Sequence, residues 1–354
     1  MYILNDKIKD LVPYEPIEAE GKIRLDANES FLNPSSELSD KILKAVGKVA
    51  FNRYPDPKAR ELCKAFAKLY NVNPDFVTAG NGSDELISII NSAFLQKGDA
   101  VMTMVPDFSM YAFYAYVSEG NLIELPKNED FTIDVDRAIN EINEKNVKLV
   151  LFSNPCNPTS IVLEKEKVRK LITSVNALVV LDEAYMDFSD QSLIEEIENF
   201  DNVIILKTCS KALGMAAIRL GFAISSREIT KALQAVKSPY NVNSVTQEIG
   251  REILSDIDSI KSGIKKIIAS RDDLYEGLKK IENKYPDKIK LIKPDTNFVY
   301  MKAEDAQEIF KYLFDNGIVI RCFKDYLRIA AGRNYENAAV LDTLEKYFAE
   351  CDKK

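Results

Sequence analysis

The sequence predicts an α/β fold: a large domain with a mostly parallel sheet between helices, and a smaller α+β domain after it. Runs rich in leucine and β-branched side chains recur in the middle of the chain, at residues 99–105, 147–152, 178–181 and 203–206. Helical patterns such as residues 164–175 lie between them. This alternation is typical of parallel strands joined by helices. It stops near Ser238-Pro239-Tyr240, where we expect the large domain to end.

The last third of the chain has a different order of elements. It begins with a helical stretch over residues 247–283, in which we expect one break. The later pattern predicts a strand at 297–302, a helix at 306–316, strands around Val319 and Leu327, and a final helix at 336–349. Such mixed, non-alternating elements indicate a smaller α+β domain.

The first 45 residues contain Pro13, Pro16 and Pro34 and little periodicity, so we expect an arm that packs on the smaller domain. The predicted organisation is an arm at 1–45, a large domain at 46–240 and a small domain at 241–354.

Composition excludes several classes of function. The chain has 354 residues, 46% of them hydrophobic, and a net charge of -8 with acids and bases interleaved. An acidic chain without a basic patch is a poor nucleic-acid binder. No apolar run approaches the ~20 residues of a membrane helix, and the start of the sequence lacks a secretory pattern. The five cysteines form no C-x-x-C pair. We therefore expect a cytoplasmic protein with reduced thiols.

The absence of histidine narrows the chemistry further. It removes Ser-His-Asp and Cys-His catalysis and every histidine-based metal site, and the sequence predicts no metal. Proton transfer near neutral pH must then use a carboxylate, a lysine, a tyrosine or a cofactor.

Two polar clusters contain candidate ligand-binding groups. Gly80-Asn-Gly-Ser-Asp-Glu85 precedes a helical run at 86–94, which Ser83 or Asp84 would cap. An ordinary capped helix explains this cluster, and so does a helix start that receives a phosphate. The second cluster, which follows a strand, is Ser153-Asn-Pro-Cys-Asn-Pro-Thr-Ser160. It is either an ordinary proline-rich turn or a turn that holds the Asn157 side-chain amide rigidly at the carboxyl end of the strand.

Two further clusters follow strands. Leu178-Val-Val-Leu runs directly into Asp182, at the carboxyl end of a strand, where ligands bind in open α/β sheets; capping of the next helix is the alternative. Lys211 follows another strand within Lys207-Thr-Cys-Ser-Lys211, with Arg219 downstream. A lysine alone is usually a solvated charge, but Lys211 stands among small and apolar residues.

In this order the four clusters resemble the fold-type I pyridoxal-phosphate (PLP) aminotransferases. The pattern S-K-x(7)-R-x-G starts at Ser210, with D-E-A-Y at Asp182 and N-P-T at Asn157 upstream. The resemblance runs from Arg24-Leu-Asp-Ala-Asn-Glu29 to Leu327-Arg-Ile-Ala-Ala-Gly332. Those two segments, with Asn52-Arg-Tyr-Pro-Asp-Pro57, look like the histidinol-phosphate aminotransferases within the superfamily.

The resemblance implies a role for each residue around the PLP ring. Lys211 would form the Schiff base and then, once freed, move the substrate proton. Asp182 would pair with the pyridine nitrogen. Asn157 and Tyr185 would hydrogen-bond the phenolic oxygen, and Phe108 would stack on the ring.

It also implies a phosphate site and a partner subunit. The phosphate would lie at the helix start and against nearby polar side chains: Gly82, Ser83, Asp84, Thr208, Ser210 and Arg219. Tyr54 would reach the phosphate of the neighbouring subunit, which implies a homodimer with shared active sites.

The same resemblance implies the substrate contacts. Arg328 would bind the carboxylate of glutamate, Arg321 would help to bind the phosphate of histidinol phosphate, and Asn28 and Glu29 would lie at the substrate mouth. The chain departs from the family at Ser160, where the turn usually has glycine, and in the small residues at 215–218.

The resulting prediction is amino transfer between histidinol phosphate and 2-oxoglutarate or glutamate. An aromatic amino acid substrate and decarboxylation of threonine phosphate stay open, because the bond broken depends on how the substrate lies over the ring. A PLP sensor joined to a transcription regulator is disfavoured, since no basic helix-turn-helix precedes the core pattern. A cofactor-free α/β binding protein is the last alternative.

Overall fold

The central feature is a seven-stranded sheet, seen here in a computed structural model that describes residues 2–9, 11–13 and 15–352. Every strand of this sheet except β8 runs in the same direction. The strands in spatial order are β2 (Val77–Gly80), β8 (Gly221–Ser225), β7 (Val203–Thr208), β6 (Leu178–Asp182), β5 (Leu149–Ser153), β3 (Ala100–Val105) and β4 (Asn121–Pro126). The four strands expected from apolar runs are confirmed as β3, β5, β6 and β7. The strands β2, β4 and β8 were not predicted.

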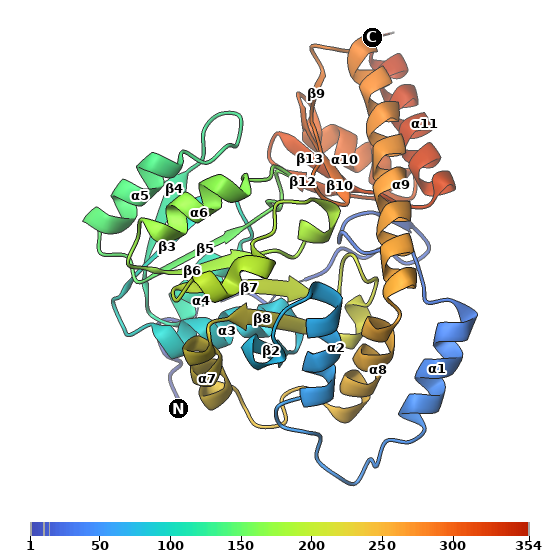
Figure 1. The fold of residues 1–354 in the computed structure, drawn as a ribbon. Helices are drawn as coiled ribbons and strands as arrows, with labels where there is room; N and C mark the ends of the chain where they lie inside the picture. The colour runs from blue at the N-terminus through green and yellow to red at the C-terminus, as the bar shows by residue number, and fades with distance from the viewer. Residues whose placement is uncertain (1, 10, 14, 353–354) are drawn as a thin grey trace.

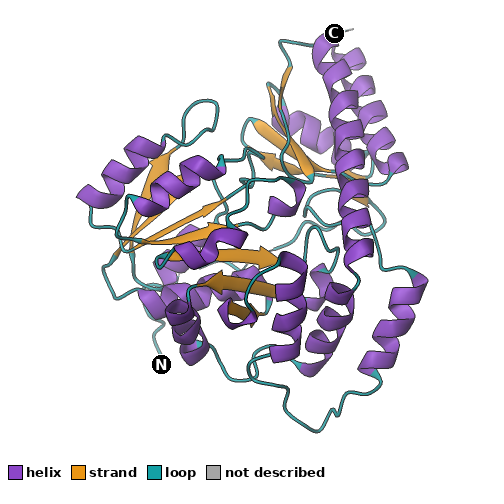
Figure 2. Cartoon of the chain, viewed as in Figure 1, coloured by secondary structure: helices purple, strands orange, loops and turns teal. Residues whose placement is uncertain are grey.

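Helices cover both faces of this sheet (Figures 1 and 2). One face packs on α2 (Arg60–Tyr70), α5 (Val135–Glu144) and α6 (Lys165–Thr173). The other packs on α3 (Gly82–Phe94), α4 (Met110–Val117) and α7 (Arg227–Val236). The central strands are largely apolar because both faces are buried: in β5, Val150 contributes to one core and Leu151 to the other. The predicted α/β class is confirmed.

A second, antiparallel sheet lies near the C-terminus. Its strands in spatial order are β12 (Arg321–Phe323), β13 (Tyr326–Ala330), β10 (Phe298–Ala303) and β9 (Ile289–Ile292). Three helices share its core: α9 (Ile257–Lys284), α10 (Ala306–Asp315) and α11 (Asn334–Cys351). Figure 1 shows α9 and α11 side by side. Leu25 joins this core from the N-terminal part of the chain, where β1 (Ile23–Arg24) pairs with β11 (Ile318–Val319).

The predicted break in the long helical stretch is confirmed at Asp256, between α8 (Ser244–Ser255) and α9. The Asp256 carboxylate accepts a hydrogen bond from the backbone N–H of Ser259 at 3.3 Å, so the same residue ends one helix and caps the next. Helix α1 (Ser36–Val46), which was not predicted, packs on α8, and α8 also contacts α2. The short 3₁₀ helices are Pro74–Phe76, Met186–Phe188, Ile194–Asn199 and Ala216–Ile218.

The domain limits at residues 45 and 240 stay a prediction. Over the described residues, no helix combines the length and the apolar character that membrane crossing requires.

Candidate active site

Three neighbouring parallel strands end in polar side chains at one edge of the large sheet. Strand β5 ends at Ser153, β6 at Asp182 and β7 at Thr208, and Ser153 is the direct register partner of Asp182. Parallel strands bring their carboxyl ends to a common edge. Three of the four predicted clusters therefore meet here, because each follows one of these strands.

Asp182 is buried and already holds two hydrogen bonds. Its Oδ1 accepts from the backbone N–H of Ala184 at 3.0 Å, and its Oδ2 accepts from the Tyr111 hydroxyl at 2.9 Å. Burial raises the pKa of Asp182 to about 6, against the opposing effect of these hydrogen bonds. A cationic partner at this carboxylate would favour the ionised form.

Lys211 follows β7 and lies at the same edge. Its Nζ donates to the carbonyl oxygen of Ala27 at 2.8 Å and lies 6.0 Å from the centre of the Tyr185 ring. Burial, together with the nearby Arg328 guanidinium, lowers the pKa of Lys211 to about 8. At pH 7 about one tenth of this amine is consequently uncharged, far more than for an ordinary lysine, and the uncharged form is the one that acts as a nucleophile or base.

Tyr185 and Asn28 form the wall beside Lys211. The Asn28 side-chain amide donates to the Tyr185 hydroxyl at 2.9 Å, and the Asn28 carbonyl accepts from the Asn297 side chain at 3.0 Å. Asn28 has a φ of 54°, in the left-handed region that asparagine tolerates. Its Oδ1 is buried without a hydrogen-bond partner among the described residues, so this wall keeps an acceptor for a further group.

Arg328 approaches the site from the small sheet. Its guanidinium donates to the Asn157 side-chain oxygen and, at 2.6 Å, to the carbonyl of Asp26. Its Nε is buried without a partner among the described residues. Burial lowers the pKa of Arg328. Arg321 is its register partner on the adjacent strand, so both arginines lie on the same face of the sheet.

The start of α3 faces Arg219. The predicted cap at Ser83 or Asp84 is wrong: α3 begins at Gly82 with Asn81 as N-cap residue, and Asn81 instead donates its backbone N–H to Glu85 at 2.6 Å. The N–H groups of the first helical turn have no partner within the helix. A Cβ on Gly82 would lie 3.0 Å from Arg219 Nη2, and a Cβ on Gly221 would lie 2.4 Å from the Ser83 nitrogen. These glycines allow the helix start, β8 and Arg219 to converge.

Two hydroxyl groups lie beside the α3 start and Arg219, and together these groups form what we call the phosphate cradle. Thr208 Oγ1 hydrogen-bonds Ser210 Oγ at 3.1 Å, and Arg219 Nη1 donates to Ser210 Oγ at 3.4 Å. Asp84 accepts from the Tyr114 hydroxyl at 3.1 Å, while its other oxygen is buried without a partner among the described residues. A helix start, two hydroxyls and a guanidinium are suited to an anion such as a phosphate.

Phe108 and Tyr54 differ sharply in position. The Phe108 ring meets Tyr111 edge to face at 5.6 Å, next to the Asp182 carboxylate that Tyr111 binds. Tyr54 is 82% exposed and stacks on Tyr240 at 4.6 Å. Within the described part of the chain, Tyr54 has no hydrogen bond to the residues at the strand ends.

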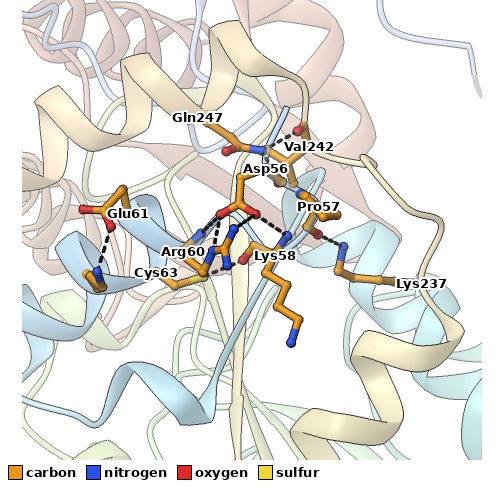
Figure 3. Close-up of polar contacts among 10 residues, drawn as sticks. Asp56, Pro57, Lys58, Arg60, Glu61, Cys63, Lys237, Val242 and Gln247 are labelled. Carbon is orange, nitrogen blue, oxygen red and sulfur yellow. Dashed lines mark hydrogen bonds and ion pairs between the residues drawn. The ribbon is translucent and has the colours of Figure 1, made fainter. Parts of the chain in front are cut away.

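The loop after Tyr54 is nevertheless firmly held (Figure 3). The carbonyl of Asp56 accepts from the Gln247 side chain at 3.0 Å, and the carbonyl of Pro57 accepts from Lys237 Nζ at 2.8 Å. The Asp56 carboxylate also accepts from Arg60 at 3.0 Å. The exposed Tyr54 therefore stands on an anchored support.

With this geometry in place, comparison with known proteins identifies the family. Residues 20–344 match the model of the family described as aminotransferase class I and II. The chain belongs to the class I and II aminotransferases. This aminotransferase is 40% identical over 349 residues to the histidinol-phosphate aminotransferase of Clostridium kluyveri (97% of this chain, 98% of the relative). It is 42% identical over 343 residues to that of Clostridium novyi (96% and 95%).

Solved structures agree on the fold of this aminotransferase. The histidinol-phosphate aminotransferase of Sinorhizobium meliloti, in complex with pyridoxal-5'-phosphate, superposes with a TM-score of 0.88 at 24% identity and 98% coverage of both chains. The L-threonine-O-3-phosphate decarboxylase of Porphyromonas gingivalis gives 0.79 at 21% identity, covering 92% of this chain and 99% of that one. The fold alone therefore does not separate transamination from decarboxylation.

Sequence reasoning missed several groups that this aminotransferase brings to the site. Tyr111 holds Asp182, and the carbonyls of Asp26 and Ala27 hold Arg328 and Lys211. Tyr111 lies in the first turn of α4, three residues after Phe108, and its ring meets the Phe108 ring edge to face.

Proposed function

We propose that this aminotransferase transfers an amino group between histidinol phosphate and 2-oxoglutarate, with PLP as its cofactor. The observation that carries the proposal is the 40–42% identity, over at least 96% of the chain, to histidinol-phosphate aminotransferases of two Clostridium species. Three properties of the site support it: a lysine with a lowered pKa, a buried carboxylate, and unpaired polar groups at the site walls.

The residues fit PLP in two places. The cradle of the α3 start, Ser210 and Arg219 suits its phosphate. Asp182 suits a protonated ring nitrogen, because that cation would offset the cost of burying the carboxylate. When bound, PLP supplies an electron-accepting ring that weakens the bonds at the substrate carbon.

The remaining chemistry comes from side chains of this chain. Lys211 Nζ, as the free amine, would attach the cofactor and, once released, would move the proton at the substrate carbon. Asp182, oriented by its hydrogen bond from Tyr111, would keep the proton on the ring nitrogen. Asn157 and Tyr185 would hydrogen-bond the phenolic oxygen of the ring, and Phe108, beside Tyr111, would stack against its face.

Two arginines on one face of the small sheet suit substrates that each have an anionic group. Arg328 binds the carboxylate of glutamate through its unpaired Nε and a second N–H. Arg321 binds the phosphate of histidinol phosphate, with Asn28 and Glu29 at the mouth of the site.

A substrate screen tests this assignment. Purified protein loaded with PLP is given histidinol phosphate and 2-oxoglutarate, and glutamate is measured. We expect turnover with this pair to exceed turnover with phenylalanine or aspartate as donor by at least tenfold. Preferred turnover of phenylalanine, or release of carbon dioxide from threonine phosphate, would contradict the substrate assignment while leaving the cofactor assignment intact.

A homodimer with shared sites is the second part of the proposal. Large apolar side chains around the Tyr54 loop are exposed: Leu43 by 69%, Phe51 by 77% and Tyr54 by 82%. Such a patch on a rigid support is suited to a second copy of this chain, whose phosphate cradle would receive the Tyr54 hydroxyl.

Mixed dimers test the sharing. Tyr54→Asp places a negative charge at the neighbour's phosphate, and Lys211→Ala removes the attachment point, so each variant alone should be nearly inactive. A dimer of one chain of each kind has one intact site, because the Lys211→Ala chain still supplies Tyr54. We expect activity to return on subunit exchange. Tyr335→Asp, at a tyrosine 60% exposed, serves as the control and should be active by itself. Mixed dimers without regained activity would contradict sharing.

A further inference from the structure

Asp107, at the end of strand β3, is a buried carboxylate to which the roles above assign no function. Its side chain is 1% exposed. Oδ1 accepts from the backbone N–H of Phe108 at 2.8 Å and from the Ser153 hydroxyl. Oδ2 accepts from the Ser153 backbone N–H and from Lys127 Nζ, both at 3.2 Å. Four donors therefore converge on one carboxylate, which fixes its orientation.

These bonds connect two segments that approach the cofactor site from different strands. The Ser153 hydroxyl, which donates to Asp107, accepts from the backbone N–H of Asn157 at 3.1 Å. An unbroken series of hydrogen bonds therefore runs from the backbone of Phe108 through Asp107 and Ser153 to the backbone of Asn157. Phe108 and Asn157 are the residues assigned to the face and the phenolic oxygen of the ring.

The counter-charge comes from a third segment. Lys127 follows β4, and its side chain is also 1% exposed. Its Nζ donates to Asp107 at 3.2 Å and to the carbonyl of Pro106 at 2.9 Å, and it contacts Cys156 Sγ at 3.0 Å. Burying both members of an ion pair is costly and is weak evidence for a purely stabilising role. Here the pair places a fixed acceptor between the two ring-contacting segments.

We propose that Asp107 is a positioning residue that holds the Phe108 ring and the Asn157 amide at a fixed separation, through its bonds to the Phe108 backbone and to Ser153. The proposal rests on the proposed PLP site. Its consequence is specific: a loosened Asn157 donates a weaker hydrogen bond to the phenolic oxygen, so the lysine-linked cofactor becomes more basic.

Two variants interrupt the series at different points. Asp107→Asn replaces one acceptor oxygen by an NH₂ group, which is itself a donor and cannot accept the hydrogen bonds of the donors that face it. Ser153→Ala removes only the hydroxyl link and leaves the Asp107–Lys127 ion pair in place. Ile142→Val, in α5 within the core on one face of the sheet, is a control that costs ~1 kcal/mol without touching the series.

The measurement is the pH titration of the visible absorbance of the PLP-loaded protein, with cofactor affinity and kcat/KM alongside. We expect both variants to shift the midpoint upward by about half a unit to one unit, which corresponds to one weakened hydrogen bond. Cofactor affinity should fall about threefold to tenfold, and kcat should fall more than KM rises. The Ile142→Val protein should titrate as the unmodified one does.

The outcomes separate this inference from the proposed function. Unmodified protein that binds no PLP would defeat the proposed function itself. Unmodified protein that titrates normally, with a Ser153→Ala variant of unchanged midpoint, would overturn the positioning role. If Asp107→Asn does not fold, Ser153→Ala still decides the question, because it leaves no buried charge unpaired.

Discussion

The strand ends of the large sheet and the Tyr54 loop contrast within one chain. At the strand ends, Asp182 is 4% exposed and hydrogen-bonded on both oxygens, and Lys211 is directed by a backbone carbonyl. Tyr54 is 82% exposed and stacks on another surface tyrosine ring, although hydrogen bonds hold the loop behind it.

This difference separates the groups that carry out the proposed chemistry from a group that would only add one hydrogen bond to the cofactor phosphate. Groups that must have a shifted pKa need burial, and the sheet edge supplies it within a single chain. A hydroxyl that only adds a hydrogen bond to a phosphate needs no shifted pKa. Another chain can provide it from a rigid, exposed position.

The largest effect is expected at Lys211. Lys211→Ala removes both the attachment point and the base, so turnover should fall by about 10⁴-fold, the upper range for loss of a general base. PLP should still bind, held by the phosphate cradle, but without the absorbance of the lysine-linked form. Lys207→Ala is unsuitable as a control, because Lys207 bridges Glu183 and Asp187 in the interior. Lys231→Ala, on α7, is suitable. Multiple turnovers by Lys211→Ala would end its catalytic assignment.

Asp182 should show opposite effects on activity and on stability. Asp182→Asn removes the carboxylate for the ring nitrogen and should lower kcat by roughly 10²–10³-fold. The same change should stabilise the cofactor-free protein at pH 8. The folded-state pKa of about 6 lies above the unfolded value, so ionisation of Asp182 weakens folding as pH rises through 6.

The stability gain should therefore depend on pH in one direction. It should be present above pH 6, reach no more than about 3 kcal/mol, and fade toward pH 4, where Asp182 is protonated in both states. Denaturant titrations of the two cofactor-free proteins at pH 5 and pH 8 measure it. A variant that is less stable at both values would show that the buried carboxylate is stabilising.

Loading of PLP should depend on the pKa of Lys211. Attachment needs the uncharged amine, so the loading rate of cofactor-free protein should fall about tenfold per pH unit below pH 8 and level off above it. Arg328→Met should move the midpoint upward, because it removes a cation that lowers this pKa after burial. Arg321→Met is the matched control. A midpoint near 10 in the unmodified protein would mean that Lys211 is solvated.

Whether the sequence predicts a strand of the large sheet depends on whether the strand has a local pattern of its own. Strands β3, β5, β6 and β7 were predictable because they are buried on both faces and so are largely apolar. The edge strands β2 and β4 were missed. Strand β2 has only four residues, and Glu124 interrupts β4. These segments form strands because they pair with neighbouring strands, and no local sequence pattern indicates that pairing.

The residues of the site also fall into those that the sequence pattern indicates and those that it does not. Asp182, Asn157 and Thr208 were predictable as side chains that follow strands, and the fold brings those strand ends together. The carbonyls that hold Lys211 and Arg328 were not, because every residue has a carbonyl. The cap of α3 was predicted wrongly, since the rule favours serine and aspartate and does not see that Glu85 binds the backbone of Asn81. The catalytic and binding roles themselves stay predictions.

The smallest effect is expected at Ser160, which is as buried as Asp182 but makes no contact assigned to the cofactor. Its φ is 66°, a conformation that glycine adopts more easily. Its hydroxyl hydrogen-bonds Thr296 Oγ1 at 2.6 Å and accepts from the Asp295 N–H at 3.0 Å. Ser160→Gly loses these bonds but also relieves backbone strain, so its unfolding free energy should stay within about 1 kcal/mol.

Ser160→Ala is the matched comparison, because it loses the same bonds and keeps the strain. Its unfolding free energy should fall by about 1–3 kcal/mol, measured by urea denaturation, while both variants keep kcat/KM within about threefold. An alanine variant more stable than the glycine variant would mean that the left-handed backbone at Ser160 carries no cost. A large loss of activity in either variant would mean that burial at the sheet edge, rather than contact with the cofactor, decides which residues are indispensable.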